Sequence, residues 1–516
     1  MLDAMMLPPP PVNEPVKNYA PGSPERESLK TELARLAGNP IEFGHFIGGR
    51  EQRSGKLVQV HAPHNHQLVL GRRFKGASEE VQAAIDAALA AKHDWACMPF
   101  PARAAIFLKA ADLLATKYRD LANATTMLGQ SKTAHQAEID SACELIDFWR
   151  FNVHFAARLM QDQPVSGAGT WNMLEQRPLD GFVLAITPFN FSSIAGNVPT
   201  APAIMGNTVV WKPAETAVLS AFAIMKVLEE AGLPGGVVNM VMGPGSVVGP
   251  LCLPHPHLAG VHFTGSTGVF QNIWKTIGDN VAKYHCYPRI VGETGGKDFI
   301  FIHPSADVDA AATAIVRGGF EFQGQKCSAA SRIYAPKSLW PKLKERLVAT
   351  IAEIRVGDVA DFRNFMGAVI DAAAFRDHKG YIDIARSDPK CSILTGGTYD
   401  DSEGFFIQPT LVETTDPKHK LMQEEIFGPV LTLWVYDDAK VDEALRLLDE
   451  TSPYALTGAV FAQDRAAIQM MMQRLRFSAG NFYVNDKPTG AVVGQQPFGG
   501  SRASGTNDKA GSLLNI

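Results

Sequence analysis

The sequence predicts an α/β protein built on doubly wound parallel sheets. Residues 181–265 alternate strand-like and helical segments, and residues 299–486 contain a second run of the same kind. The strand-like segments of the first run are apolar almost throughout, which is typical of parallel strands covered on both faces. Because such alternation inserts a helix between successive parallel strands, it favours sheets with helices packed on both sides.

The individual elements of both runs follow from these patterns. In the first run, helices are expected near residues 193–205 and 216–231, and the second helix is followed by Gly232 and Pro234, a usual stop signal. Strands are expected in the first run at 181–187, 207–213, 237–241 and 260–265, and in the second at 299–302, 331–335, 366–370, 430–437, 457–462 and 481–486.

The part of the chain before residue 181 has a different pattern. Apolar residues at three- and four-residue spacing predict helices at 26–37, 78–96, 101–123 and 133–160. Short strands are expected within residues 44–72, and residues 170–180 read as an extended excursion. Four prolines at 8–11 indicate a stiff arm, and a length of 516 residues favours two or three domains.

Composition limits the partners and the compartment. The charge of −5, from 48 basic and 53 acidic residues, argues against a nucleic-acid or anionic-membrane surface. No apolar run is long enough to span a bilayer, and the N-terminus resembles neither a signal nor a transit peptide. Six widely spaced cysteines without CxxC indicate free thiols, so the expected compartment is the cytoplasm, or the mitochondrial matrix for a eukaryotic source.

Two loops after predicted strands are candidates for a nucleotide site. The GxGxxG fingerprint is absent, but FTGSTG (263–268) lies between a strand and a helix, where free N–H groups suit a phosphate. In WKPAE (211–215), Lys212 and Glu215 follow another strand, and a carboxylate there can accept from ribose hydroxyls and repel a 2′-phosphate. Taken alone, FTGSTG is more typical of an ordinary turn, and WKPAE is equally consistent with a solvated charged loop.

The catalytic candidates are Cys327 in GQKCSAAS and Glu293 in GETGGKD. Cys327 has small or polar neighbours, and the adjacent Lys326 is expected to favour the thiolate. Glu293 can serve as a general base for a water. The alternatives are an inert buried thiol and an ordinary turn acid.

Other site chemistries have less support. A cysteine hydrolase needs a histidine partner, and fourteen histidines leave that alternative open. No metal site is predicted, because His255, His257 and His262 lack metal-ligand spacing.

Seven motifs together resemble the aldehyde dehydrogenase superfamily, in order and from about residue 40 to the end: TPFNF (187–191), NTVVWKPAE (207–215), FTGST (263–267), GETGGK (292–297), GQKCSA (324–329), EEIFGPV (424–430) and PFGG (497–500). The resemblance implies a Rossmann-like cofactor domain, an α/β catalytic domain and a small oligomerisation flap. The implied parts are an N-terminal arm and helix (1–40), an NAD-binding domain (41–292, with flap residues near 165–180), a catalytic domain (293–486) and a substrate anchor loop with a shortened oligomerisation segment (487–516).

Within that superfamily, the chain resembles most the branch that oxidises glutamate γ-semialdehyde. NYAPGSPERESL (18–29), CELIDFWRFN (143–152), FNFSSIAGN (189–197), GQKCSA (324–329) and PTGAVVGQQPFGG (488–500) carry this closer resemblance. It implies NAD-dependent oxidation of the semialdehyde, the open form of pyrroline-5-carboxylate, to glutamate in proline breakdown. Oxidation of another aldehyde and a catalytically silent relative remain the alternatives.

The resemblance also implies a role for each matched residue. Cys327 is the nucleophile, Asn190 stabilises the oxyanion with the Cys327 backbone N–H, and Glu293 activates water. The implied NAD contacts are Thr187, Lys212, Glu215, Gly265, Ser266, Thr267, Glu425 and Phe427. The implied substrate contacts are Ser328, Gly490 and Ala491 for the carboxylate, Glu144 for the ammonium, and Phe191 and Phe498 for the aliphatic chain.

A homodimer or dimer-based higher oligomer is implied as well. The family continues beyond KAGSLLNI with a segment that docks subunits, so weaker subunit docking is expected here.

Overall fold

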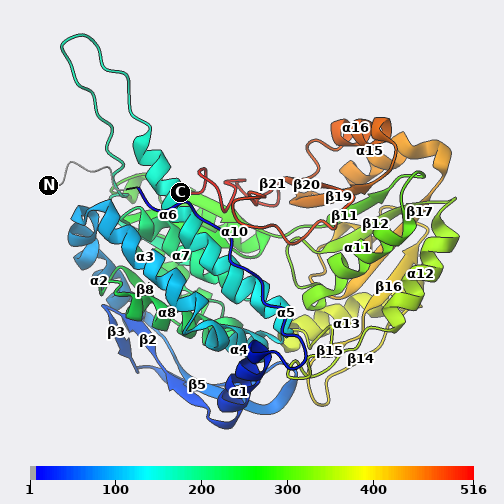
Figure 1. The fold of residues 1–516 in the computed structure, drawn as a ribbon, viewed down its shortest axis with the longest axis horizontal. Coiled ribbons are helices and arrows are strands. Elements are labelled where there is room, and N and C mark those ends of the chain that lie inside the picture. Colours follow the sequence, from blue (N-terminus) through cyan, green and yellow to red (C-terminus); the bar gives the residue numbers. More distant parts are fainter. Residues whose placement is uncertain (1–6) are drawn as a thin grey trace.

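The computed structural model describes residues 7–516 and has two α/β parts (Figure 1). Each part contains a seven-stranded sheet. The N-terminal part occupies the blue-to-green side of Figure 1, and the second part the green-to-orange side. The C-terminal segment, in red, runs between the two parts and contributes β21 (Ser501–Arg502), which pairs with β18 (Tyr454–Ala455).

The sheet of the N-terminal part has the order β10-β9-β6-β7-β8-β2-β3. Its first five strands are parallel, and β2 and β3 extend it antiparallel. The strands are β2 (His45–Ile47), β3 (Arg50–Gln52), β6 (Phe182–Ile186), β7 (Thr208–Lys212), β8 (Val238–Met240), β9 (Leu258–Thr264) and β10 (Arg289–Glu293). The chain leaves β6 toward β7 and returns on its other side as β9, so the sheet has its switch point at β6, where doubly wound sheets bind ligands.

Within residues 7–516, ten α-helices belong to this part: α1 (Pro24–Gly38), α2 (Ser78–Cys97), α3 (Phe100–Ala115), α4 (Arg119–Gln130), α5 (Ala134–Ala137), α6 (Leu145–Gln161), α7 (Ser192–Ile204), α8 (Val218–Ala231), α9 (Gly245–Cys252) and α10 (Thr267–Asp279). A separate three-stranded sheet contains β1 (Ile41–Phe43), β5 (Asn65–Lys75) and β4 (Lys56–Ala62). A π-helical segment, Glu138–Glu144, joins α5 to α6, and such segments are frequent at functional sites.

The sheet of the second part has the order β13-β16-β17-β12-β11-β19-β20, with only the edge strand β13 antiparallel. Its strands are β11 (Asp298–Ile302), β12 (Ala330–Pro336), β13 (Cys391–Thr395), β16 (Thr410–Thr414), β17 (Val430–Tyr436), β19 (Thr457–Phe461) and β20 (Asn481–Val484). Its helices are α11 (Val308–Phe320), α12 (Trp340–Ala352), α13 (Ala372–Ser387), α14 (Lys420–Gln423), α15 (Val441–Thr451) and α16 (Arg465–Arg474). A small hairpin of β14 (Tyr399–Asp400) and β15 (Phe406–Ile407) lies beside it.

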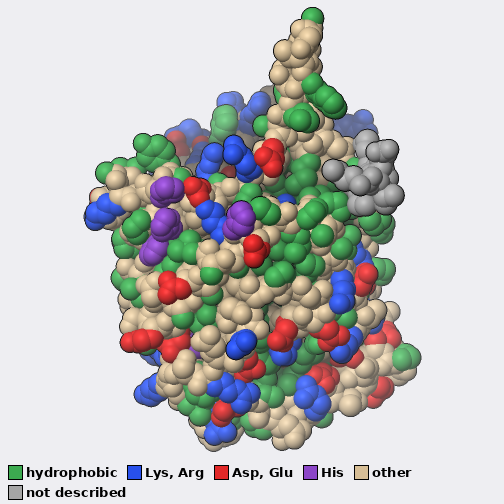
Figure 2. Space-filling model, turned by 90° about the vertical axis from the view of Figure 1, so that its left-hand side faces the viewer, with side chains coloured by type: hydrophobic (Ala, Val, Ile, Leu, Met, Phe, Trp, Pro, Cys, Tyr) green, Lys and Arg blue, Asp and Glu red, His purple; other side chains and the backbone are tan. Residues whose placement is uncertain are grey.

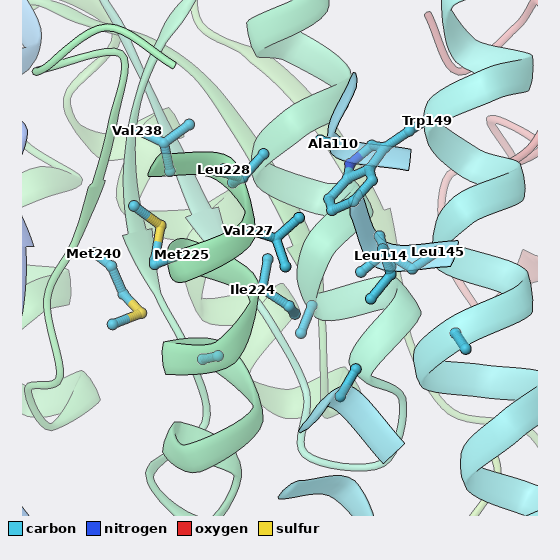
Figure 3. Close-up of a cluster of buried hydrophobic side chains, with 14 of the residues drawn as sticks. Ala110, Leu114, Leu145, Trp149, Ile224, Met225, Val227, Leu228, Val238 and Met240 are labelled. Carbon is cyan, nitrogen blue, oxygen red and sulfur yellow. The ribbon is translucent and has the colours of Figure 1, made fainter. Parts of the chain in front are cut away.

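The largest apolar core joins the helices to the first sheet (Figure 3). Leu114 on α3, Leu145 on α6 and Ile224 on α8 meet there and are almost fully buried. Trp149 packs into the same cluster and donates from its indole nitrogen to Thr200 Oγ1 on α7 at 3.0 Å. Burial of each large aliphatic side chain contributes about 1.5–3 kcal/mol, so this cluster fixes α6 and α7 against the sheet that carries the site.

Three sequence-based expectations are corrected by the structure. Residues 366–370 do not form a strand; the segment is irregular, and its backbone groups bond to distant side chains. The helix expected over 101–123 is broken between α3 and α4, where the Tyr118 N–H donates to Leu113 O at 2.9 Å. The sequence did not predict strands β10, β13 and β16. The predicted strands of the first run and the end of α8 at Gly232 are confirmed.

Residues 162–179 project from the body between α6 and β6 (Figures 1 and 2). The excursion has no regular secondary structure, as expected for residues 170–180. Val165, Trp171 and Met173 on it are 92%, 85% and 76% exposed.

Candidate functional site

Cys327 lies in the loop between a 3-10 turn at Glu321–Gly324 and β12. Phe322, Gln323 and Gly324 all have positive φ, at 51°, 56° and 64°. Two non-glycine residues in the left-handed region carry strain that the surroundings must offset. A β-carbon at Gly324 would come within 2.5 Å of Gly428 O, so this position also needs glycine for space.

Side-chain amides of the loop itself bond it to surrounding backbone groups. Gln323 Nε2 donates to Ser131 O at 2.9 Å and to Ala368 O at 2.7 Å. Gln325 Oε1 accepts from the backbone N–H of Ile370 at 2.9 Å. The irregular segment at 366–370 therefore braces residues 321–329, the predicted catalytic loop, and its backbone groups that bond to this loop are not available to a sheet.

Asn190 follows β6 and reaches the same loop. Its Nδ2 donates to Gln325 O at 3.1 Å, and the side chain is buried. An amide nitrogen has two hydrogens, so one remains to donate to an oxygen that develops near Cys327. The predicted oxyanion donor is thus held against the loop that carries the predicted nucleophile.

Glu293 ends β10 beside the thiol. Cys327 Sγ donates to Glu293 Oε1 at 3.7 Å. Burial raises the pKa of the Glu293 carboxyl to about 8. Burial also raises the pKa of the Cys327 thiol, and the nearby Glu293 charge raises it further, so the resting pair holds a protonated thiol beside a carboxyl.

The C-terminal segment fixes the position of the acid. Glu293 forms an isolated β-bridge with Gly505, and the Thr294 N–H donates to Ser504 O at 3.0 Å. Thr506 exchanges hydrogen bonds with Gly292 on the strand. Residues 504–506 therefore keep the end of β10 against the catalytic loop.

The expectation that Lys326 favours the thiolate is wrong. Its ammonium is buried and pairs with Glu321 at 3.2 Å. The charges that act on the pKa of the Cys327 thiol are those of Glu293, Asp298 and Glu425, all of which raise it. A basic residue next to Cys327 in sequence therefore does not lower the pKa of the thiol here, because its ammonium is paired with Glu321.

A cavity of about 1100 Å³ lies at the switch point of the first sheet. Its volume exceeds the usual range for small-ligand sites. The N-termini of α9 and α10 both contribute to it, and such termini favour phosphate. Eight predicted residues line it: Thr187, Asn190, Lys212, Gly265, Ser266, Cys327, Glu425 and Phe427.

Glu425 is set at the inner end of this cavity by the GETGGK loop. Its Oε1 accepts from the Gly296 N–H at 2.8 Å, and burial raises the pKa of its carboxyl to about 7. A β-carbon on Gly295 would run into the Glu425 carboxylate, so glycine leaves that carboxylate room in its observed position. Phe427 has φ of 57° and meets Phe189 edge-on at 5.8 Å between ring centroids. This end of the cavity therefore combines a carboxylate with aromatic walls.

Two predicted cofactor contacts are not in the lining of the cavity. Glu215 Oε2 accepts from Arg73 at 2.7 Å and pairs with Lys75 at 3.4 Å. Thr267 Oγ1 donates to Ala503 O at 3.4 Å. The roles of both residues stay predictions.

A second cavity, of about 440 Å³, opens on the other side of the thiol. All six predicted substrate contacts line it together with Cys327: Glu144, Phe191, Ser328, Gly490, Ala491 and Phe498. Ser328 Oγ lies 2.8 Å from Thr489 Oγ1, which ties the catalytic loop to residues 487–500. Gly490 has φ of 93°, a conformation that glycine adopts without strain.

The structure adds residues that the sequence did not single out. Lys487 Nζ lies 3.1 Å from where a β-carbon on Gly490 would be, so a cation stands beside the predicted anion loop. Buried Lys132 pairs with Asp140 at 2.6 Å, and its ammonium is 4.4 Å from the Phe191 ring centroid. The SKTAHQAEID segment gave no pattern that distinguished these from ordinary helix charges.

No group of three or more metal-ligating side chains occurs within residues 7–516. In the same range, no helix is both long and apolar enough to cross a membrane.

Residues 50–514 match the aldehyde dehydrogenase family, and the chain belongs to this family. A relative from Dictyostelium discoideum, named mitochondrial delta-1-pyrroline-5-carboxylate dehydrogenase, is 51% identical over 511 residues, which are 98% of this chain and 92% of that protein. The Homo sapiens protein of the same name is 48% identical, over 97% of this chain and 89% of the relative.

Among solved structures, the delta-pyrroline-5-carboxylate dehydrogenase of Mycobacterium tuberculosis bound with NAD superposes with a TM-score of 0.96. It is 54% identical, and the match covers 100% of this chain and 95% of that one.

Proposed function

We propose that this protein oxidises L-glutamate γ-semialdehyde, the open form of Δ1-pyrroline-5-carboxylate, to L-glutamate with NAD. The observation that carries the proposal is the position of Cys327, which lines both the large cavity and the smaller one. An aldehyde in the smaller cavity and a nicotinamide in the larger one can therefore meet at one sulfur. The relatives and the superposed structure bear the name of this activity.

The residues of the large cavity fit NAD. Two helix N-termini with Gly265 and Ser266 suit a pyrophosphate, and the Glu425 carboxylate suits ribose hydroxyls. When bound, NAD supplies the acceptor for the hydride that leaves the substrate carbon. Phe427 gives the nicotinamide end an apolar wall beside Cys327.

Thiol addition begins with the pair formed by Cys327 and Glu293. Glu293 takes the thiol proton, the sulfur bonds to the aldehyde carbon, and the carbonyl oxygen becomes an oxyanion. Asn190 Nδ2 and the Cys327 backbone N–H donate to that oxygen. Loss of hydride from the same carbon then leaves a thioester on Cys327.

Hydrolysis completes the cycle. Glu293 first releases the thiol proton to solvent and then takes a proton from water; the oxygen of that water bonds to the thioester carbon, and the carbon–sulfur bond breaks. Glu293 gives that proton to the departing sulfur, so the thiol of Cys327 is restored as the acid leaves. Glu293 is suited to both proton transfers because burial holds the pKa of its carboxyl near neutrality, at about 8.

The smaller cavity suits an amino-acid aldehyde. The N–H groups of Gly490 and Ala491, the Ser328 hydroxyl and the Lys487 ammonium form an environment for a carboxylate. Glu144 lies at the same cavity and accepts from Ser193 Oγ at 2.9 Å, which leaves its other oxygen for an ammonium. Phe191 and Phe498 offer apolar faces to the carbon chain that joins the aldehyde of the substrate to its carboxylate.

One assay tests the activity. The absorbance of NADH is followed with pyrroline-5-carboxylate as substrate, with the wild type and with Cys327→Ala. NADH is expected from the wild type only. Its absence from the wild type would refute the activity, and turnover by the alanine variant would refute the assigned nucleophile.

We also propose a homodimer or dimer-based oligomer, because the projecting residues 162–179 expose Val165, Trp171 and Met173 to solvent. Light scattering should give at least twice the mass of one chain, and the substitution Trp171→Ser should lower the measured mass. A monomeric wild type would contradict the proposal.

We also propose a reducing compartment, the cytoplasm or the mitochondrial matrix, since all six cysteines are free.

A further inference from the structure

The N-terminal arm, residues 7–22, forms part of the wall of the substrate cavity. It has no regular secondary structure and runs along α6 in Figure 1, where it is dark blue. Asn13, Glu14 and Val16 line the cavity together with residues of loop 487–500. The mechanism above uses none of these arm residues, although they lie beside its substrate.

Asn13 joins a helix to this loop through its side-chain amide. Nδ2 donates to Asp147 Oδ2 on α6 at 2.8 Å and to Val493 O in the loop at 2.9 Å. Oδ1 accepts from Gln495 Nε2, also in the loop, at 2.9 Å. Both amide hydrogens and the amide oxygen of Asn13 are therefore used. Asn13 and Val493, which this amide joins, lie 480 positions apart in the chain.

The arm is itself firmly held, so Asn13 has a fixed base. The Glu14 N–H donates to Asp147 Oδ1 at 2.7 Å. The Glu14 carboxylate pairs with Arg119 at 2.5 Å and with Arg150 at 2.8 Å. Charge-assisted hydrogen bonds of this kind are about twice as strong as neutral ones.

Loop 487–500, by contrast, depends on contacts from outside. It contains no helix and no strand, and Gly490 and Gly494 have φ of 93° and 80°. The N–H groups of Gly490 and Ala491 donate no backbone hydrogen bond within residues 7–516. Free N–H groups stabilise an anion best when they are fixed before it binds, because the ordering cost is then already met.

We propose that Asn13 is a positioning residue for substrate specificity. It holds the tip of loop 487–500 so that the N–H groups of Gly490 and Ala491 receive the substrate carboxylate. The inference rests on the proposed function, since it assigns a role toward that carboxylate. An arm that only stabilised the fold would affect all aldehydes alike.

The test compares two substrates in Asn13→Ala. Pyrroline-5-carboxylate supplies the aldehyde with a carboxylate, and pentanal supplies a chain of equal length without one. For the first, KM should rise about tenfold, the usual worth of one or two hydrogen bonds, with kcat changed less than about twofold. For pentanal, both constants should stay within about twofold of the wild type.

Two further variants sharpen the comparison. Asn18→Ala changes an exposed arm residue whose amide only caps the Ala20 N–H, so it should leave both substrates unaffected. Gln495→Ala removes an exposed side chain and one arm–loop bond from the loop side. It should raise the KM for pyrroline-5-carboxylate in the same direction as Asn13→Ala, and it gives the answer even where Asn13→Ala fails to fold.

The outcomes separate the inference from the function. Equal KM changes for both substrates, or no change for either, would overturn the role of Asn13 while the wild-type activity stands. A wild type that oxidises pentanal but not pyrroline-5-carboxylate would overturn the proposed function and this inference with it.

Discussion

The ionisation of Glu293 is expected to set the pH dependence of hydrolysis. Its carboxyl must be a carboxylate to take a proton from water, and burial raises its pKa to about 8. The base form therefore appears only as pH rises through that value. About a tenth of the protein has it at pH 7 and about half at pH 8, so hydrolysis should become roughly fivefold faster over that interval.

Stopped-flow absorbance separates this step from the earlier ones. One equivalent of NADH forms per site as the thioester is made, and further NADH requires hydrolysis. In Glu293→Gln the amide cannot accept the proton, so the steady-state rate should fall by about 10²–10⁴. Where the first turnover survives in this variant, the NADH burst isolates the thioester.

The pH dependence is measured on the wild type, which is also the control for Glu293→Gln over the same pH range. A steady-state rate that does not change between about pH 6 and about pH 9 would refute the assignment of Glu293 as the titrating base. A Glu293→Gln variant with near wild-type turnover would refute its role in hydrolysis altogether. Because the Cys327 thiol also has a raised pKa, the burst rate is fitted separately from the steady state.

Three further changes test other parts of the site. Asn190→Ala removes the oxyanion donor and should lower the burst rate about 10²–10³-fold; an unchanged burst would contradict that role. Gly295→Ala pushes a β-carbon into the Glu425 carboxylate, so a titration with NAD should show the KM for NAD raised by a larger factor than kcat is lowered. An unchanged KM for NAD would count against Glu425 as a cofactor contact. Lys132→Met leaves buried Asp140 without its ammonium and should cost about 3–5 kcal/mol in denaturant unfolding; no loss would contradict a paired ion.

Much of the site was predictable because its residues lie in local patterns. Eight of the residues predicted near NAD or the thiol line the large cavity, and all six substrate contacts line the smaller one. All of them except Glu144, which ends the π-helical segment before α6, belong to a strand end or a glycine-bearing loop, and the carboxyl ends of parallel strands meet at one edge of a sheet. Motifs at the ends of successive parallel strands are therefore expected to lie close together in the fold.

Side-chain direction was less predictable. Lys326 precedes Cys327 but pairs with Glu321, and Glu215 follows Lys212 but accepts from Arg73. Adjacency in sequence does not specify which neighbour a long charged side chain reaches, because its partner comes from another element.

The resemblance to a known family implied the roles of Cys327, Glu293 and Asn190. The sequence by itself determined the alternating strands and helices and the end of α8 at Gly232. These follow from residue type and short-range spacing. Only the tertiary structure decided that residues 366–370 brace the catalytic loop and that β13 and β16 complete the second sheet. The same holds for the bridge from Asn13 to Val493. Such features depend on backbone groups and amides whose partners lie hundreds of positions away, and no local pattern encodes that distance.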